Sequence, residues 1–542
     1  MTNEELWYKN AVFYEVYVRA FYDSNGDGIG DLRGLMQRLD YFQEIGIDCL
    51  WLLPIYPSPL EDDGYDIADY YGVLPEYGNL DDFKALLEAA HARGLRVVTD
   101  LVLNHTSHQH PWFQAARCDK NSPYRDYYVW SDTDDKYKQA RIIFLDTEKS
   151  NWSWDDQAGQ YFWHRFYSSQ PDLNYGNLAV QEEMLKVVKF WLDLGVDGFR
   201  VDAVPYLFER EGTNCENLPE THAYLKRLRR FVDENYPGRV LLCEANQWPK
   251  DVRPYFGDGD EFQMGFNFPV MPRIFMSVRK ADRRPLVWIM DRIPTIPDSC
   301  QWCTFLRNHD ELTLEMVTEE ERQWMWQEYA PEPRMRLNLG IRRRLAPLLD
   351  NDRRKIEMAN SLLFSLPGSP IVYYGDEIGM GDNIWLTDRD GVRTPMQWDD
   401  SQNGGFSEGD AEHMYSPIIT GQTYGPQRIN VAAQRADPNS LWHTIRRMIA
   451  VRKANPVFCC GDMTWAETGT DAVTAYWREK EGRCLLILNN LTDASKEITV
   501  SLVNETYGSA SDLLSNEQLP LTQVGFLSLV LEPYQYRWLS FD

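Results

Sequence analysis

Long apolar segments are missing from this chain of 542 residues. Its N-terminus has no basic stretch followed by an apolar one, and no apolar run approaches the roughly 20 residues of a membrane-spanning helix. Internal repeats and low-complexity tracts are missing too. We therefore expect a protein that is neither secreted nor anchored in a membrane, with a cytoplasmic location.

Cysteine and positive charge are also scarce. The nine cysteines show no metal-binding spacing. Cys300 and Cys303 adjoin a predicted strand, so we interpret them as core residues and expect free thiols. Asp and Glu number 82 against 55 for Lys and Arg, a formal net charge of −27. Such a charge opposes binding to nucleic acid or to an anionic membrane, which leaves a small molecule as the expected partner, and a homo-oligomer as the alternative to a monomer.

What the chain does have is a set of apolar runs that end in polar residues. The clearest is GFRVDAV, in which Arg200 and Asp202 lie two residues apart. In an extended strand these two side chains share a face. A fixed cation keeps a neighbouring acid ionised, and an ionised carboxylate in a cleft can act as a nucleophile. Taken alone, a structural salt bridge is an equal alternative.

Three further runs decide between these alternatives. LRVVTDLVLNHT, VLLCEAN and CTFLRNHDEL carry Asp100, Glu244 and Asp310 in or directly after an apolar stretch. Acids at four strand ends favour a functional site, because the carboxyl ends of parallel strands meet at one edge of a sheet.

Eight such runs alternate with helical segments, for example at residues 81–93, 180–194 and 221–236. The predicted strands are 12–19, 49–54, 95–103, 196–201, 240–243, a weaker one at 266–269, 303–307 and 370–374. Eight parallel strands are the number that closes a (β/α)8 TIM barrel, an α/β fold with its active site at the C-terminal strand ends.

Interruptions of this pattern indicate the domain organisation. The barrel is expected from residues 1–105 and 172–455, with 106–171 as an inserted subdomain after strand 3 that roofs the site. A charged insertion at 312–354 follows strand 7; its Arg run predicts a solvated helix face or intramolecular ion pairs. Short alternating segments at 456–542 predict a C-terminal antiparallel β-sandwich.

The segments GYDIADY, DLVLNHT, GFRVDAV, CEAN and RNHD, in this order, resemble the region signatures of the α-amylase superfamily of glycoside hydrolases and transglycosylases. Residues 319–355 and 373–399 most resemble the trehalose synthases of that superfamily, the maltose α-D-glucosyltransferases. The resemblance implies an isomerase that interconverts maltose and trehalose through a covalent glucosyl-enzyme intermediate, with minor hydrolysis to glucose.

Two alternatives stay open at this point. An α-glucosidase, oligo-1,6-glucosidase or sucrose isomerase of the same superfamily would share the acids, so that only residues 312–354 and the acceptor contacts separate it from a trehalose synthase. A non-catalytic amylase-like binding protein is the remote alternative. Such proteins carry a membrane anchor and can lose catalytic acids, whereas this sequence retains all three acids and shows no anchor.

Retaining cleavage of an α-glucoside needs one carboxylate that attacks the anomeric carbon and another group that protonates the leaving oxygen. We expect Asp202 as the nucleophile, kept ionised by Arg200, and Glu244 as the general acid, because burial favours its protonated form. Asp310 would stabilise the transition state. These three positions match the catalytic triad of the superfamily.

The resemblance also implies sugar contacts. Donor-side contacts are expected from Tyr65, Asp66, His105, Arg200, His309 and Arg389. Acceptor-side contacts are expected from Tyr206, Asn246, Glu311 and Glu315. The last two share a face if their segment is helical, and ordinary surface acids are the alternative for them.

Two structural cation sites are expected. The loop from Asp23 to Asp31 spaces oxygens like a calcium-binding loop, but position 12 is Gly34 rather than Glu, so a true EF-hand is not predicted. Its expected ligands are Asp23, Asn25, Asp27, the Ile29 carbonyl and Asp31, for Ca²⁺ or Mg²⁺. The second site, for Ca²⁺, is implied by the resemblance alone, with Asn104, Asp172, Glu209 and the carbonyls of Tyr206 and Leu207 as ligands.

Overall fold

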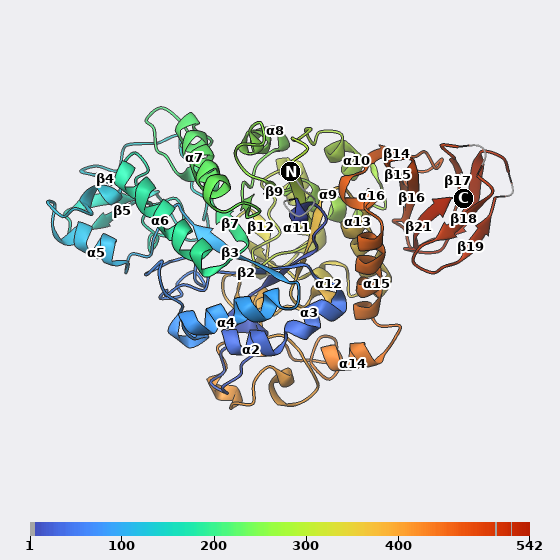
Figure 1. Cartoon of the computed structure of the whole chain (residues 1–542), viewed down its shortest axis with the longest axis horizontal. Coiled ribbons are helices and arrows are strands. Elements are labelled where there is room, and N and C mark those ends of the chain that lie inside the picture. Colours follow the sequence, from blue (N-terminus) through green and yellow to red (C-terminus); the bar gives the residue numbers. More distant parts are fainter. Residues whose placement is uncertain (1–5, 505–506, 522, 542) are drawn as a thin grey trace.

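A closed barrel of eight parallel strands forms the middle of the molecule (Figure 1). The computed structural model describes residues 6–504, 507–521 and 523–541. Around the barrel the strands follow the order β1-β13-β10-β9-β8-β7-β3-β2. Their bounds are β1 Phe13–Val16, β2 Cys49–Leu52, β3 Arg96–Val102, β7 Gly198–Asp202, β8 Val240–Cys243, β9 Met264–Phe266, β10 Gln301–Phe305 and β13 Ser369–Tyr373.

The predicted TIM barrel is confirmed, with corrections to single strands. The predicted strand 12–19 is too long, because the chain turns after β1 into the short helix α1 (Val18–Phe21). Strand β9 lies upstream of the predicted 266–269. It cannot extend to residue 269, because Pro269 is already the N-cap of α9 (Val270–Lys280). The other predicted strands lie within two residues of the observed ones at each end.

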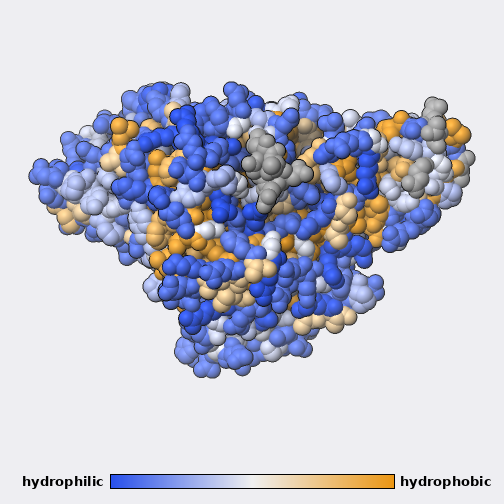
Figure 2. Space-filling model, viewed as in Figure 1, coloured by the Kyte–Doolittle hydropathy of each residue, from blue (hydrophilic) through white to orange (hydrophobic). Residues whose placement is uncertain are grey.

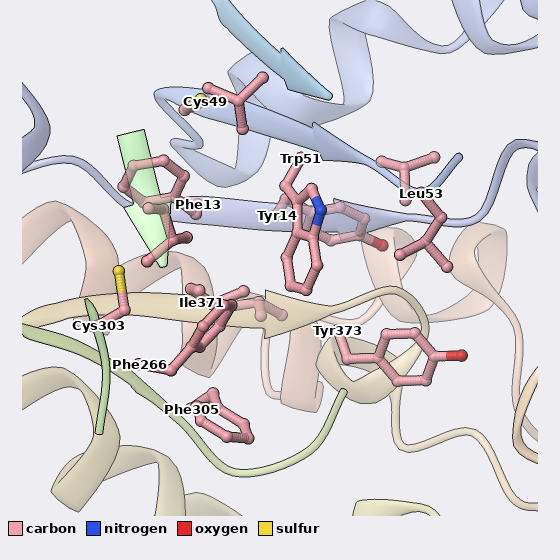
Figure 3. Close-up of a cluster of buried hydrophobic side chains, with 14 of the residues drawn as sticks. Phe13, Tyr14, Cys49, Trp51, Leu53, Phe266, Cys303, Phe305, Ile371 and Tyr373 are labelled. Atoms are coloured by element: carbon pink, nitrogen blue, oxygen red, sulfur yellow. The ribbon is translucent and has the colours of Figure 1, made fainter. Parts of the chain in front are cut away.

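Large side chains fill the barrel beneath its C-terminal rim (Figure 3). The ring of Trp51 lies 5.5 Å from that of Phe266, which in turn lies 5.5 Å from Phe305. Trp51 also donates its indole N–H to Asp100 at 2.8 Å, and its ring faces the Arg200 guanidinium at 5.3 Å. The packed core thus supports the charged residues at the strand ends.

Helices surround the barrel, and local signals define their ends. Asn79 and Asp82 form a capping box at the start of α4, and α6 ends at Gly195 in the left-handed conformation (φ 110°). The helices of the barrel are α2 Leu32–Gln37, α3 Leu39–Ile45, α4 Leu80–His91, α6 Leu178–Leu194, α7 Pro219–Asn235, α8 Pro249–Val252, α9, α10 Arg284–Met290, α13 Arg353–Ser365, α14 Val431–Ala436 and α15 Leu441–Ala454. No helix in the described ranges is long and apolar enough to cross a membrane.

The chain leaves the barrel after β3 and returns before α6. This excursion contains helix α5 (Pro111–Cys118) and a small antiparallel sheet of β4 (Trp130–Ser131), β6 (Gln160–Trp163) and β5 (Trp152–Asp155). An antiparallel bridge between His105 and Asp172 joins its two ends. The excursion therefore has its own sheet and is attached at a narrow base beside the site.

A second excursion follows β10. Its elements are α11 Glu319–Tyr329, β11 Arg336–Leu337, β12 Gly340–Ile341 and α12 Leu345–Leu348. The Arg run lies before α12 rather than on a helix face. Arg343 pairs with Asp382 at 2.9 Å, and the buried Arg344 donates to the Tyr374 carbonyl at 2.7 Å. Of the two predicted interpretations, intramolecular pairing is the correct one.

The C-terminal region is a β-sandwich beside the barrel (Figure 1). A short helix, α16 (Val457–Cys460), leads into it. One sheet contains β14 Asp462–Trp465, β15 Val473–Lys480, β16 Arg483–Asn490, β21 Tyr536–Phe541, β18 Ser509–Asp512 and β19 Gln518–Pro520, and the other contains β17 Lys496–Ser501 and β20 Phe526–Leu531. Side chains of both sheets, among them Leu486 and Ile498, share a second apolar core. The face of the molecule in Figure 2 is mainly hydrophilic, in keeping with the high net charge.

Candidate active site

The three predicted catalytic acids line one cavity at the C-terminal end of the barrel. Asp202 is the last residue of β7, Glu244 follows the neighbouring strand β8, and Asp310 lies in the loop after β10. Because β7 and β8 pair in register, with Val201 beside Cys243, Asp202 and Glu244 leave the sheet side by side. The cavity contains about 830 Å³ of empty space, part of it continuous with solvent.

Arg200 lies beneath these acids and is almost fully buried. Its guanidinium pairs with Asp100 at 2.6 Å, contacts Asp202 Oδ1, and approaches Glu244 at 3.4 Å. Sequence reasoning predicted that Arg200 keeps Asp202 ionised. Burial raises the pKa of Asp202 above its ordinary value, and the Arg200 charge lowers it, which is the direction that the prediction requires. Arg200 also contacts Asp100 and Glu244, so that one cation serves three acids.

Glu244 has the properties of a general acid. Burial raises its pKa to about 7, the Arg200 charge lowers it, and the Asp202 charge raises it further. One of its oxygens accepts the Ala203 N–H at 2.9 Å. Ala203 is held in the left-handed region (φ 52°), a strained conformation for a residue with a Cβ that turns this N–H toward Glu244.

Asp310 and His309 form a charged pair of a different kind. Burial alone would raise the pKa of Asp310, but His309 and Arg389 hold it well below its ordinary value. His309 lies between two carboxylates: its Nδ1 is 2.5 Å from Glu15 and its Nε2 is 3.2 Å from Asp310. Burial lowers the pKa of His309, but the two acids outweigh this and raise it to about 9. His309 is therefore an imidazolium in the neutral range.

The expected donor-side residues divide into two groups. Tyr65, His105 and Arg389 line the cavity. Arg200 and His309 lie behind its surface and act on the acids they contact. A direct contact of either residue with the sugar stays a prediction.

Asp66 makes hydrogen bonds within its own loop. Its buried carboxylate accepts them from the Ser58 hydroxyl at 2.8 Å and from the backbone N–H groups of Glu61 and Asp62, at 2.9 Å and 3.2 Å. Asp62 of the same loop forms part of the cavity lining. A contact between Asp66 and the sugar stays a prediction.

The four expected acceptor-side residues, Tyr206, Asn246, Glu311 and Glu315, all line the cavity. The segment from Glu311 to Glu315 is not helical, so the condition for a shared helix face is not met. Glu311 instead pairs with Arg389 at 3.0 Å, and the Asn246 amide donates to the Thr313 hydroxyl at 3.0 Å.

The excursion after β3, residues 106–171, forms the roof of the cavity. Its residue Arg141 connects this roof to the rim of the barrel, which is formed by the loops after β7 and β10. It pairs with Glu315 at 2.7 Å and with Glu216 at 2.9 Å, and it donates to the Tyr206 hydroxyl at 3.1 Å. The excursion after β10 is linked as well, because the Asn338 N–H donates to Asp146 at 2.8 Å. The site is closed by side-chain bonds between separate loops.

Sequence reasoning missed several lining residues. They are Asp62, Ile143, Phe144, Phe166, Phe268, Asn308 and Thr313. Phe144 and Phe166 come from the roof, where aromatic clusters in an otherwise polar segment were the available signal. The Phe144 ring faces the Arg389 guanidinium at 4.9 Å, which joins the roof to the donor-side wall.

The residues expected at the second cation site fit an ion. Asn104 Oδ1, Asp172 Oδ2 and Glu209 Oε1 are buried without a hydrogen-bond partner. Burial raises the pKa of Asp172 to about 8, and burial together with the charge of Asp172 raises that of Glu209 well above its ordinary value. Oxygens of this kind are the ligands that Ca²⁺ prefers, and a cation would stabilise both acids in their charged form.

The loop from Asp23 to Asp31 differs. Asp23 accepts hydrogen bonds from the backbone N–H groups of Asn25 and Gly28, at 3.0 Å and 2.8 Å, and Asp31 caps α2 through the Gly34 N–H at 2.8 Å. None of its oxygens is among the buried, unpartnered atoms of the described residues. Over the same part of the chain, no group of three or more His, Cys, Asp or Glu side chains is arranged to hold a metal ion. An ion in this loop stays a prediction.

Comparison with known proteins agrees with this architecture. The profile "Alpha amylase, catalytic domain" matches residues 15–461, and "Maltogenic Amylase, C-terminal domain" matches 463–538. The chain is 58% identical over 540 residues to "Trehalose synthase/amylase TreS" of Mycobacterium tuberculosis, covering 98% of this chain and 90% of the relative. It is 32% identical to an oligo-1,6-glucosidase of Parageobacillus thermoglucosidasius, covering 90% and 91% of the two chains.

A solved α-amylase structure from H. orenii superposes with a TM-score of 0.81 at 30% identity, covering 98% of this chain and 100% of the other. The fold, the catalytic-domain match and the relatives aligned along nearly the whole length agree with one another. The chain belongs to the α-amylase family, in its trehalose synthase branch.

Proposed function

We propose that the protein interconverts maltose and trehalose by intramolecular transglucosylation and releases glucose as a minor product. The observation that carries the proposal is the 58% identity to a trehalose synthase along 98% of the chain. Three acids around one roofed cavity support it. The lower identity to an oligo-1,6-glucosidase, 32%, places simple hydrolysis second.

Cleavage begins with Asp202. Its Oδ1 is held by Arg200, so Oδ2 is the oxygen that attacks the anomeric carbon of the donor glucose. Glu244, with a pKa of about 7, donates its proton to the leaving oxygen. The products of this step are a glucosyl ester on Asp202 and a free glucose molecule.

Transfer is the reverse of the cleavage step, but the retained glucose has turned so that its anomeric hydroxyl faces the ester. Glu244, now ionised, takes a proton from the anomeric hydroxyl of the retained glucose, whose oxygen attacks the ester and forms trehalose. Water that reaches the ester gives hydrolysis instead. The ratio of the two products therefore depends on how well the roof retains glucose and excludes water.

Asp310 stabilises the charge that develops on the sugar ring. His309 and Arg389 keep its pKa low, so it stays an anion beside the oxocarbenium-like transition state. Its negative charge also favours the protonated form of Glu244. Asp310 thus contributes to both halves of the reaction without forming a bond to the sugar.

The test is incubation of the purified protein with maltose, followed by chromatographic separation of the sugars. We expect trehalose as the main product and glucose as the minor one, and the same mixture from trehalose as the starting sugar. Glucose as the only product would overturn the proposal in favour of the hydrolase.

We also propose a structural calcium ion held by Asn104, Asp172 and Glu209, with the carbonyls of Tyr206 and Leu207. The three unpartnered oxygens support it. A chelator should lower the melting temperature, added Ca²⁺ should restore it, and Asp172→Asn should remove most of this dependence. A chelator effect that Asp172→Asn leaves unchanged would point to the Asp23–Asp31 loop, with Ca²⁺ or Mg²⁺ as its ion.

We also propose a cytoplasmic location for the enzyme, which the free state of all nine cysteines supports.

A further inference from the structure

Two adjacent cysteines lie where the barrel meets the C-terminal β-sandwich. Cys459 and Cys460 end the short helix α16, and their sulfur atoms are in contact. Cys459 is buried and Cys460 is exposed, so one thiol is covered by protein and the other faces solvent. Neither lies in the active site.

The surroundings of the pair favour a thiolate on Cys460. The hydrogen bond between the two thiols lowers the pKa of Cys460 to about 6; burial opposes this, and the charges of Lys9, Lys480 and Arg452 favour it. The pKa of Cys459 is raised by the same hydrogen bond and by burial. An exposed, low-pKa thiolate beside a second thiol is the arrangement found in oxidation-sensitive sites.

Cysteines in the barrel are different. Cys243 and Cys303 are fully buried, and burial raises their pKa values well above the ordinary range. Such thiols are inert toward oxidants. Cys303 therefore has the core role that the sequence predicted, whereas the surroundings of Cys459 and Cys460 at the junction favour a reactive role.

We propose that Cys459 and Cys460 are a vicinal dithiol that hydroperoxides oxidise reversibly to a disulfide. The Cys460 thiolate attacks the peroxide, the O–O bond breaks, and a protonated leaving oxygen departs as water to leave a sulfenic acid. The Cys459 sulfur then attacks the sulfenic sulfur and a second water leaves. Two thiols and one hydrogen peroxide give one disulfide and two waters.

The resulting bond would be easy to reduce. Neighbouring Cα atoms are about 3.8 Å apart, below the roughly 4.4–6.8 Å that disulfides usually span. A bond outside that range is strained and more readily reduced, which is the property of a reversible site rather than of a structural one.

Oxidation would also affect the junction. The Cys459 carbonyl accepts a hydrogen bond at 2.8 Å from Gln301, the first residue of β10. Arg478 of the sandwich binds the Phe458 and Gly461 carbonyls, each at 2.9 Å. Ring closure must rotate the peptide between the two cysteines and disturb this set of bonds. We expect the oxidised protein to have a lower melting temperature than the reduced one.

The experiment treats the reduced full-length protein with hydrogen peroxide, alkylates the remaining thiols and analyses the peptide that contains both cysteines by mass spectrometry. We expect a peptide that has lost two hydrogen atoms and takes up no alkyl group, and that recovers both thiols with dithiothreitol. Two outcomes would overturn the proposal. In one, Cys460 is oxidised beyond the sulfenic acid while Cys459 still takes up an alkyl group; in the other, both residues take up an alkyl group after the peroxide treatment.

Variants and an internal comparison sharpen this test. In Cys459→Ser the sulfenic acid on Cys460 should persist and be trapped by dimedone, whereas Cys460→Ser should leave Cys459 unreactive. Cys118 is exposed but lies on another helix. At about pH 6, Cys460 should be alkylated about tenfold faster than Cys118, the excess expected for a low-pKa thiolate after allowance for its weaker nucleophilicity. Equal rates would contradict the assigned thiolate.

Discussion

The floor and the roof of the cavity are held by different kinds of interaction. On the floor, Asp202 and Glu244 extend from neighbouring strands that pair through the backbone, above the buried Arg200. On the roof, Arg141 reaches its partners through side chains alone, and its own side chain is 37% exposed. Backbone pairing fixes positions closely, whereas ion pairs between loops can open and close.

This difference separates two tasks of the proposed reaction. The floor supplies the groups that break and form the glycosidic bond. The roof determines whether glucose stays and whether water enters. Changes to the floor should therefore abolish all products, whereas changes to the roof should alter the ratio of products.

The largest effect is expected from Asp202→Asn. The variant lacks the nucleophile, so both trehalose formation and glucose release should fall by about 10⁴-fold or more. Initial rates of both products from maltose measure this, and an unchanged melting temperature shows that the fold is intact. If the variant still isomerises maltose at an appreciable rate, the covalent route is wrong and the floor has another role.

A smaller effect is expected from Glu15→Gln, which removes the charge behind His309. Loss of a direct transition-state donor costs about 10²–10³-fold, and this indirect change should cost less. In the native protein the pKa of Glu244, about 7, governs the first loss of kcat/KM with rising pH, because the general acid must be protonated. His309, with a pKa of about 9, stays protonated there.

Without the Glu15 charge the imidazolium is less stable, so the pKa of His309 falls. Two groups then lose protons over the same range, and kcat/KM should decline more steeply on the alkaline side. Glu377→Gln is a matched control, because Glu377 is a buried acid bound by the hydroxyls of Tyr14 and Tyr41 rather than by His309. The same steepening in both variants would assign it to general loss of barrel stability.

The floor could be predicted from the sequence more completely than the roof, for a physical reason. Alternation along a strand and the meeting of strand ends follow from local geometry, so Asp202, Glu244 and Asp310 were found from apolar runs and their last residues. The eight strands were found in the same way. Strand bounds failed at β1, where a turn begins early, and at the weakly predicted β9, which lies upstream of its predicted range.

The roof depends on contacts between distant loops, which no local pattern encodes. Phe144 and Phe166 lie in an irregular segment whose aromatic residues also fill its own small core. Asp62 lies just before the GYDIADY motif that contains Asp66, and only the folded loop brings Asp62 into the cavity lining. Glu311 and Glu315 line the cavity from a segment that is not helical, so their spacing of four does not explain why they meet there. The sharing of Arg200 with two other acids was not predicted for a related reason, because Asp100 and Glu244 come from other strands.

The smallest and most selective effect is expected from Arg141→Met, which keeps the length of the side chain but removes its three polar links to Glu216, Glu315 and Tyr206. Because the floor is unchanged, maltose consumption should fall little, while the ratio of glucose to trehalose should rise several-fold as water enters.

Arg117→Met is the matched control for that change. Arg117 lies in the same excursion and pairs with Asp155 at 2.8 Å, within the roof and not across the cavity. It should leave the product ratio unchanged. If both variants raise the ratio equally, general loosening of the roof controls the outcome. If neither does, glucose is retained by the lining residues themselves, and the division of labour between floor and roof does not hold. A rise with Arg141→Met alone would assign retention of glucose to the links between the roof and the rim of the barrel, because Arg117→Met removes a pair within the roof and leaves those links in place.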